Sequence, residues 1–281
     1  MHERSECVSV PVPTPCINVC RLDEATGLCL GCARNGAEIA AWAEADAGFK
    51  RAVWETLPSR RARQGMNVYR LPWTADEIGA FVESALRERS GRWSLGAEGA
   101  SVSFVIGAGE GAEIAATPDA VTVVTARGAL RLVKHEKTIA IAFGSAADPR
   151  GPEAIGLVLP RGRVDLRRDA RLDEAAIVAA HRQHRLVPLA QDGDLPTRVY
   201  ARSPDAEVPH NVAQAVLDER LHLVAETGLG RAEIFAADRQ GSGFDLSAGC
   251  FADARALPLR WPLDPIFALG AVFFKDRDAA T

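Results

Sequence analysis

Four cysteines near the start of the chain form the densest group of side chains that could do chemistry. Cys16, Cys20, Cys29 and Cys32 fall within seventeen residues, in the spacing C-x3-C-x8-C-x2-C, although the 281-residue chain has only six cysteines. Two close pairs joined by a short loop can bring four thiolates to one centre, as tetrahedral zinc or an iron–sulfur cluster requires. The spacing therefore predicts that these four residues are metal ligands.

Disulfides and buried free thiols are the two alternatives to metal binding. Structural disulfides form in oxidising compartments, and the chain shows neither a signal peptide nor an apolar run of about 18 residues, so we expect a cytoplasmic protein with reduced thiols. Buried free cysteines are common in protein cores. Four of six cysteines in one short segment nevertheless favour a ligand role.

A short helix directly after the cysteines is expected to support the site. Asn35 followed by Glu38 is a capping-box signature, and Ile39 and Trp42 then fall on one helical face. We expect Trp42 to belong to the core and to shield the site from water. Arg34 lies next to the last thiolate, so it could act as a neighbour of the metal or as a surface charge.

A second helix is predicted to start at Asp46, with Phe49, Val53, Trp54 and Leu57 at helical spacing, and to end at Pro58. The basic stretch SRRARQG that follows is expected to be a solvated helix C-terminus, where cations are favoured by the helix dipole. A module of about fifty residues with two short helices has little core, so a bound metal would contribute much of its folding free energy.

The cysteine segment and its two helices resemble a known family, the domain of unknown function 1289, whose members are described as predicted iron–sulfur proteins. The resemblance covers about residues 14–63 and rests on PCINVC, TGLCLGCAR, EIAAW and FKRAVWETLPSRR. Ala33 departs from the family, which tends to have glycine after the last cysteine. The resemblance implies an iron–sulfur cluster on the four cysteines, whereas four thiolates also suit structural zinc.

The rest of the chain predicts an α+β domain with an antiparallel sheet. Thr74 and Glu77 form a second capping box before an apolar helical stripe. Further helices are expected at 173–184 and 211–226, and β-like runs at 102–106, 121–125, 129–134, 138–143, 155–159, 197–201, 231–236 and 266–274. We therefore expect a flexible N-terminus over 1–13, a metal-binding module over 14–65 and an α+β domain over 66–281.

No motif in the larger part predicts a reaction. The chain has no G-x-S-x-G, Walker loop or H-E-x-x-H, and the glycines after residue 106 are predicted to form a hairpin loop, since Pro118 leaves no room for a Rossmann helix. We therefore expect a metal-binding protein with a binding or accessory large domain. One alternative is a structural zinc module that presents the large domain to a protein or RNA partner, and another is an enzyme whose site lies in the large domain.

The charge and composition bear on partners and source. The net charge of −4 gives no general attraction to nucleic acid or to an acidic membrane surface. The sequence neither identifies nor excludes a protein partner. Only four of 33 basic residues are lysine, and alanine is abundant, a bias that suggests a GC-rich bacterial genome.

Overall fold

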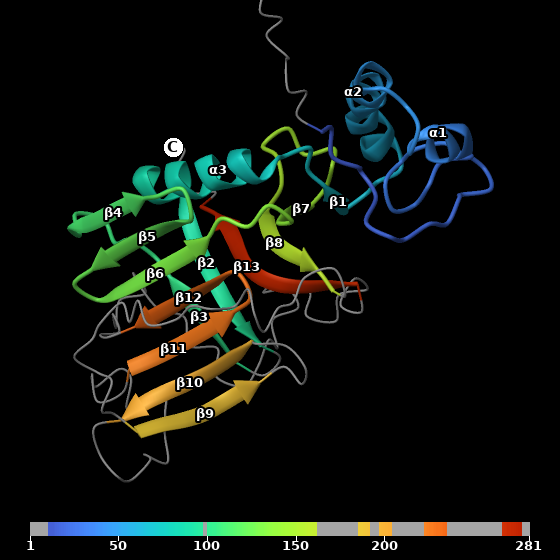
Figure 1. Ribbon diagram of the computed structural model, residues 1–281. Helices are drawn as coiled ribbons and strands as arrows, with labels where there is room; N and C mark the ends of the chain where they lie inside the picture. Colours follow the sequence, from blue (N-terminus) through green and yellow to red (C-terminus); the bar gives the residue numbers. More distant parts are fainter. Residues whose placement is uncertain are drawn as a thin grey trace, which may run out of the picture. The chain divides into compact units, whose positions relative to one another are not determined.

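The computed structural model describes residues 11–97, 100–161, 185–191, 197–203, 222–234 and 266–276 (Figure 1). The chain forms two compact units. The smaller unit comprises Met1–Trp73 and Ala142–Pro152, and the larger comprises Thr74–Ile141 and Glu153–Thr281. Most of the N-terminus predicted to be flexible, residues 1–10, lies outside the described residues, whereas the Pro13 carbonyl accepts a hydrogen bond of 2.8 Å from Nε1 of Trp54.

The smaller unit contains three elements, α1 (Gly36–Ala41), α2 (Ala47–Arg63) and β1 (Val68–Arg70). The capping box predicted at the start of α1 is present: the Asn35 side chain accepts from the backbone N–H of Glu38, and the Glu38 carboxylate accepts from the backbone N–H of Asn35. Asp46 caps α2 by accepting from the backbone N–H of Phe49. Both helices therefore begin at the predicted residues.

Pro58 does not end the second helix, so that prediction is wrong. Helix α2 continues through Pro58 to Arg63. A proline inside a helix costs about 3 kcal/mol, because it lacks an N–H and its ring clashes with the carbonyl four residues earlier. The turn beyond it forms a tertiary contact that offsets part of this cost, since Arg60 forms an ion pair with Glu38.

A small core holds the smaller unit together. Its members are the buried Ala33, Val53, Leu57 and Met66, with Trp42, Trp54, Tyr69 and Ala146 packed against them. The second segment of the unit joins this core through the backbone, where Ala146 N–H donates to the Met66 carbonyl and Gly144 N–H to the Asn67 carbonyl, each at 2.9 Å. Eight core residues bury little apolar surface, so this unit needs a further source of stability.

The larger unit begins with α3 (Ala75–Glu88), which Thr74 and Glu77 cap as predicted. Its strands are β2 (Gly91–Ala97), β3 (Ala100–Phe104), β4 (Ala112–Ala116), β5 (Ala120–Thr125), β6 (Gly128–Val133), β7 (Ile139–Phe143), β8 (Ala154–Pro160), β9 (Arg185–Gln191), β10 (Arg198–Ser203), β11 (His222–Thr227), β12 (Gly230–Ile234) and β13 (Phe267–Lys275). One sheet has the order β7-β8-β13-β2-β3, with β1 beside β7, and the other has the order β4-β5-β6-β12-β11-β10-β9.

The core of the larger unit consists of the buried faces of its sheets and the apolar stripe of α3. Phe81 of α3 meets Phe273 edge-on at 5.2 Å between ring centroids and Trp93 at 6.1 Å. Trp93 is 1% exposed and pairs with Phe104 in the antiparallel ladder of β2 and β3. The predicted α+β class with antiparallel sheets is confirmed.

Two predictions for the larger unit are wrong in detail. Residues 222–227, expected at the end of a helix, form β11, which pairs antiparallel with β10 and β12. Leu223, Val224 and Ala225 are all at most 2% exposed, and a strand buried on both faces has no period that separates it from a helix. The glycine-rich stretch is a loop without a following helix, but it links β3 and β4 in different sheets and is not a hairpin. The helix predicted at 173–184 lies outside the described residues.

Candidate metal centre

The first cysteine pair is formed by a tight turn at the surface. Cys16 is half-buried and Cys20 is exposed, and their Sγ atoms lie 3.9 Å apart. Two ligands of a tetrahedral site with metal–sulfur bonds of about 2.3 Å are about 3.8 Å apart. Asn18, at a left-handed φ of 61°, donates its backbone N–H to the Cys16 sulfur at 3.2 Å. This pair therefore has the separation that two ligands of one metal need.

The second pair is buried in a knuckle of backbone. Cys29 and Cys32 are each 1% exposed, and the Cys29 sulfur accepts the backbone N–H of Gly31 at 3.4 Å. The Cys29 carbonyl accepts the N–H groups of Cys32 and Ala33 at 3.3 and 2.8 Å. Ala33 has a φ of 63°, the left-handed conformation that glycine adopts without penalty, which accounts for the glycine that the resembling family tends to have there.

The two pairs lie against each other through Val19. The Cys29 thiol donates to the Val19 carbonyl at 3.3 Å, and residues 22 and 29 form a β-bridge. A Cβ added to Gly31 would lie 2.5 Å from the Val19 carbonyl oxygen, so only glycine fits at this crossing. The eight-residue loop between the pairs thus folds back on itself.

The thiols influence one another electrostatically. The charge of Cys16 is the main cause that raises the pKa of Cys20, followed by burial and by the charges of Cys29 and Cys32. Burial raises the pKa of Cys32, while a hydrogen bond from Arg34 opposes that rise. Four thiolates close together repel each other, so a bound cation would relieve the repulsion.

The four sulfurs are adjacent but not gathered around one point. No group of three or more His, Cys, Asp or Glu side chains in the described part of the chain could hold a metal ion as it stands. Ligation by Cys16, Cys20, Cys29 and Cys32 together thus stays a prediction, and it requires the two pairs to move together. Four sulfur donors are the ligand set that zinc and iron–sulfur clusters use, and the side chains around them are cationic.

Arg34 is a direct neighbour of the cysteine cluster. It is 3% exposed, its Nε donates to the Cys32 sulfur at 3.4 Å, and its guanidinium lies over the Trp42 ring at 4.7 Å. Its Nη1 is buried and has no hydrogen-bond partner among the described residues. A buried N–H without an acceptor is costly, so this group suits a site that gains negative charge or acceptors when it is filled.

Arg61 and Arg70 add two more cations, and sequence reasoning missed both. Burial lowers the pKa of each to about 10, while the charge of Cys32 opposes this shift at Arg61 and the charge of Cys16 opposes it at Arg70. Nε and Nη2 of Arg61 and Nε of Arg70 are buried without partners among the described residues. Arg61 was predicted to lie on a solvated helix end, yet it stands four residues after the buried Leu57 on the same helical face.

Glu38 ties the two helices behind the site together. Its carboxylate accepts two hydrogen bonds from Arg60, at 2.7 and 3.0 Å, besides capping α1. Burial alone would raise the pKa of Glu38, but the hydrogen bonds from Arg60 and Asn35 outweigh it, so the pKa falls below its ordinary value. Arg60 also donates to the Ala33 carbonyl at 3.4 Å, which connects α2 to the knuckle. The pair of Glu38 and Arg60 is neutral as a unit, and among the described residues Arg34, Arg61 and Arg70 form no ion pair with a carboxylate.

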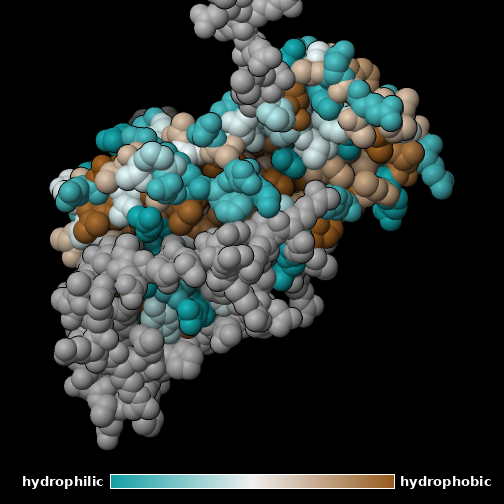
Figure 2. Space-filling view, viewed as in Figure 1, coloured by the Kyte–Doolittle hydropathy of each residue, from teal (hydrophilic) through white to brown (hydrophobic). Residues whose placement is uncertain are grey.

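The exposed large apolar residues within the described part of the chain are Leu22, Leu30 and Phe49, which all belong to the smaller unit. Leu22 lies two residues after Cys20, and Leu30 lies between Cys29 and Cys32. The Leu30 N–H donates to the carbonyl of Arg21, the residue that follows the exposed Cys20. Figure 2 shows hydrophobic side chains at the surface of this unit among hydrophilic ones. The side of the site that bears Cys20 is thus open and partly apolar.

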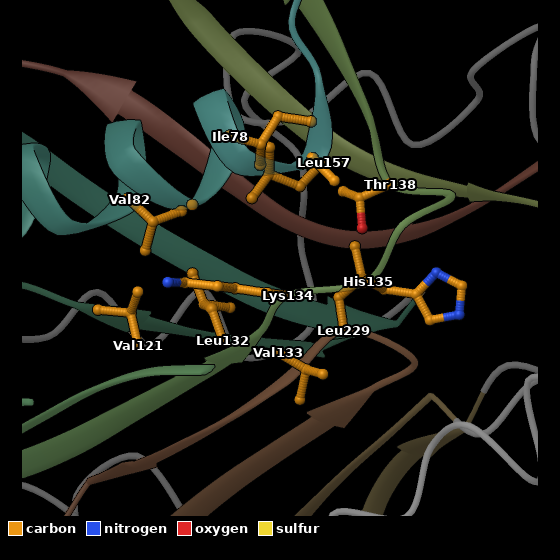
Figure 3. A pocket seen from close by; sticks show the side chains of 12 residues that line it. Ile78, Val82, Val121, Leu132, Val133, Lys134, His135, Thr138, Leu157 and Leu229 are labelled. Atoms are coloured by element: carbon orange, nitrogen blue, oxygen red, sulfur yellow. The ribbon is translucent and has the colours of Figure 1, made fainter. Parts of the chain in front are cut away.

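Two hollows lie in the larger unit. A small cavity of about 10 Å³ between α3 and the neighbouring strands is lined mainly by apolar side chains, and Figure 3 shows Lys134 beside Val82 and Val121 while the His135 ring points away. That volume holds about one water molecule. A more open hollow of about 500 Å³ is lined by Arg89, Gly91, Arg92, Val105, Ile106, Gly107, Ala108, Phe274, Lys275 and Asp276. Its described lining residues include no serine, cysteine or histidine, and the enzyme alternative stays untested.

Two family models match the chain. Residues 14–61 match DUF1289, a protein of unknown function, and residues 77–249 match DUF6925, a family of unknown function. The resemblance predicted for the cysteine segment is confirmed. The larger part, for which the sequence predicted no family, matches the DUF6925 model. No curated protein and no solved structure matches the chain. None of the described helices is long and apolar enough to cross a membrane.

Proposed function

The chain belongs to the DUF6925 family of unknown function and carries a DUF1289 segment, and from this segment we propose that it is a metal-binding protein whose ligands are Cys16, Cys20, Cys29 and Cys32. A cysteine-rich DUF1289 segment is compatible with a metal site. The near-ligand separation of Cys16 and Cys20, and the N–H groups directed at the sulfurs of Cys16, Cys29 and Cys32, support the proposal.

The finer proposal is an iron–sulfur centre. The observation that carries it is the excess of buried positive charge around the cysteines: Arg34, Arg61 and Arg70 together with a Glu38–Arg60 pair that is neutral. Four thiolates with a divalent ion leave a net charge of about −2, which three guanidiniums exceed. A cluster that accepts one electron reaches about −3, which they match.

The residues of the chain would have distinct roles at such a centre. A bound cluster would supply one-electron transfer. Cys29 and Cys32 would hold it from the buried side, and the exposed Cys20 would lie where an electron donor or acceptor approaches. Trp42 and Trp54 pack around the core behind the ligands and exclude water from that side. The large domain would bind a partner or serve an accessory role in a cytoplasmic setting.

Structural zinc is the second candidate, and one observation favours it. The knuckle of Cys29 to Cys32, with the Gly31 N–H on the first sulfur, is the kind of turn that zinc ribbons use. At a zinc site the same four ligands would stabilise the fold and carry out no redox chemistry. The module would then present the large domain to a protein or RNA partner.

The two candidates are separated by purifying the full chain without oxygen and measuring its visible spectrum with the iron, sulfide and zinc content per chain. We expect a coloured protein with stoichiometric iron and sulfide, whose absorption bleaches on reduction. A Cys29→Ser variant should lose the metal, whereas Cys250→Ser, outside the cluster in sequence, should keep it. A colourless protein with one zinc would overturn the iron–sulfur centre, and a protein with none of these metals would overturn both candidates.

A further inference from the structure

Three arginine side chains surround the cysteine cluster without carboxylate partners. Arg34 and Arg61 are each 3% exposed and Arg70 is half-buried. Within the described residues the ion pair of the smaller unit's first segment is Arg60 with Glu38, and none of the three takes part in it. Four of their N–H-bearing nitrogens are buried and find no acceptor in the part of the chain that the structure describes. Arg34 donates its Nε–H to the sulfur of Cys32 at 3.4 Å, which places the group of arginines directly beside the cysteines.

Arg61 is the most enclosed of the three. Its guanidinium lies 5.1 Å from the ring centroid of Trp54 and 5.1 Å from that of Tyr69. Its Nε and Nη2 are buried without a partner among the described residues, and both rings pack against the core that contains Ala33, the residue next to Cys32. The side chain is therefore held in one place by two rings while its hydrogen-bonding capacity remains unused.

Packing alone does not account for this arrangement. Contacts with two ring faces attract a guanidinium, but less strongly than water solvates it, so a buried cation with unused donors destabilises a protein unless an anion is near. A methionine or leucine at this position would fill the same volume without that cost. An anion close to the guanidinium would offset that cost.

We propose that Arg61, supported by Arg34 and Arg70, is a positioning residue that compensates the negative charge of the metal centre and favours its more electron-rich state. The inference rests on the proposed function, because it needs a metal at the four cysteines. For an iron–sulfur cluster the consequence is a raised reduction potential. For a tetrathiolate zinc site the consequence is a raised metal affinity.

The test compares three variants of the full chain. Arg61→Met removes the charge and keeps an apolar stem, Arg61→Lys keeps a charge, and Arg63→Met removes an exposed arginine from the same end of α2 as a control. The iron-loaded proteins are titrated with a reductant while the visible spectrum is followed. We expect Arg61→Met to shift the one-electron equilibrium at least tenfold toward the oxidised form, a fall of about 59 mV, and Arg61→Lys and Arg63→Met to stay near wild type.

A cobalt titration makes the test independent of which metal is native. Co²⁺ added to the metal-free chain reports thiolate ligation by its visible absorption, and we expect Arg61→Met to weaken binding at least tenfold relative to wild type and Arg63→Met. If purified protein holds no iron, sulfide or zinc, the proposed function fails. If metal is bound but Arg61→Met keeps both the potential and the cobalt affinity of wild type, the charge-compensation inference fails while the metal site stands.

A second variant keeps the inference testable if Arg61→Met does not fold. Arg70 lies in β1, outside both helices, and Arg70→Met removes the cation whose charge acts on Cys16. We expect it to lower the potential and the cobalt affinity in the same direction. An Arg70→Met protein that behaves as wild type in both measurements, beside a poorly folded Arg61→Met, would overturn the electrostatic role and leave only a packing role for Arg61.

Discussion

Gly31 lies at the point where the two cysteine pairs touch, which makes it the most sensitive single position of the module. An alanine Cβ there would lie 2.5 Å from the Val19 carbonyl oxygen and 3.0 Å from the Val19 Cβ. The first of these is a backbone atom, so the clash cannot be relieved by rotating a side chain, and overpacking of this kind costs about 1 to 3 kcal/mol. We expect Gly31→Ala to weaken Co²⁺ binding by about tenfold or more, since ligand geometry and folding are coupled here.

Gly36→Ala is the matched control for this prediction. Gly36 is the first residue of α1, and an added Cβ would lie 3.7 Å from Leu22 Cδ1, an ordinary contact. Alanine also restricts the unfolded chain more than glycine does. Cobalt affinity should therefore stay at or slightly above that of wild type, and equal losses in the two variants would contradict the close approach at Gly31.

At the scale of residues, the sequence names four candidate ligands, whose ligation stays a prediction, but it does not predict the buried arginines around them. The spacing of Cys16, Cys20, Cys29 and Cys32 identifies candidates because few other uses explain four thiols so close together. Arg61 escaped because a run of arginines after Pro58 resembles a solvated helix end, and only the burial of its helical face shows otherwise. The buried position of Leu57, one turn before it, is the signal that could have revealed it.

Helices α1 and α2 are joined by the carboxylate of Glu38, and this contact should make the smaller unit sensitive to pH. The folded pKa of Glu38 is lower than its unfolded value of about 4.3, so the pair with Arg60 adds stability above that pH and loses it as pH falls through the folded pKa. We expect Glu38→Gln to destabilise the smaller unit by about 1 kcal/mol at neutral pH and by much less near pH 3. Thermal unfolding at both pH values measures this difference.

The control for this prediction is Glu44→Gln, which removes an exposed carboxylate from the same unit. It should leave the unfolding temperature unchanged at both pH values. A penalty for Glu38→Gln that stays constant or grows on acidification would show that capping of α1 by the side chain, and not the charge on Glu38, is what matters.

At the scale of elements, prediction succeeds where local signals are strong. The caps at Asn35, Asp46 and Thr74 place three helix starts correctly, because each side chain accepts the backbone N–H of the residue three positions later, which is a local device. Two other outcomes do not follow from local signals: α2 continues beyond Pro58, and β11 forms where a helix is predicted. Both depend on distant contacts that no local window contains.

The whole molecule should unfold in two steps, of which only one depends on metal. The smaller unit has a core of eight residues, and a ligand present at about 1,000 times its dissociation constant adds about 4 kcal/mol to the stability of the state that binds it. Calorimetry of the full chain as purified without oxygen, and after removal of metal with a chelator, should show one transition that falls by about 10 °C or more and one that does not move. Cys29→Ser as purified should match the metal-free wild type.

The chain segment that connects the two units limits how independently they can unfold. Strand β7 passes from the larger unit into the segment Ala142–Pro152, whose Gly144 and Ala146 donate to the backbone at Asn67 and Met66. The smaller unit is therefore discontinuous in sequence, and a fragment of residues 14–65, the predicted metal-binding module, would lack these bonds. We expect that fragment to bind Co²⁺ more weakly than the full chain does. Equal affinity would show that the Ala142–Pro152 segment adds nothing to the metal-bound state, and a single transition that moves as a whole on metal removal would show that it couples the two units fully.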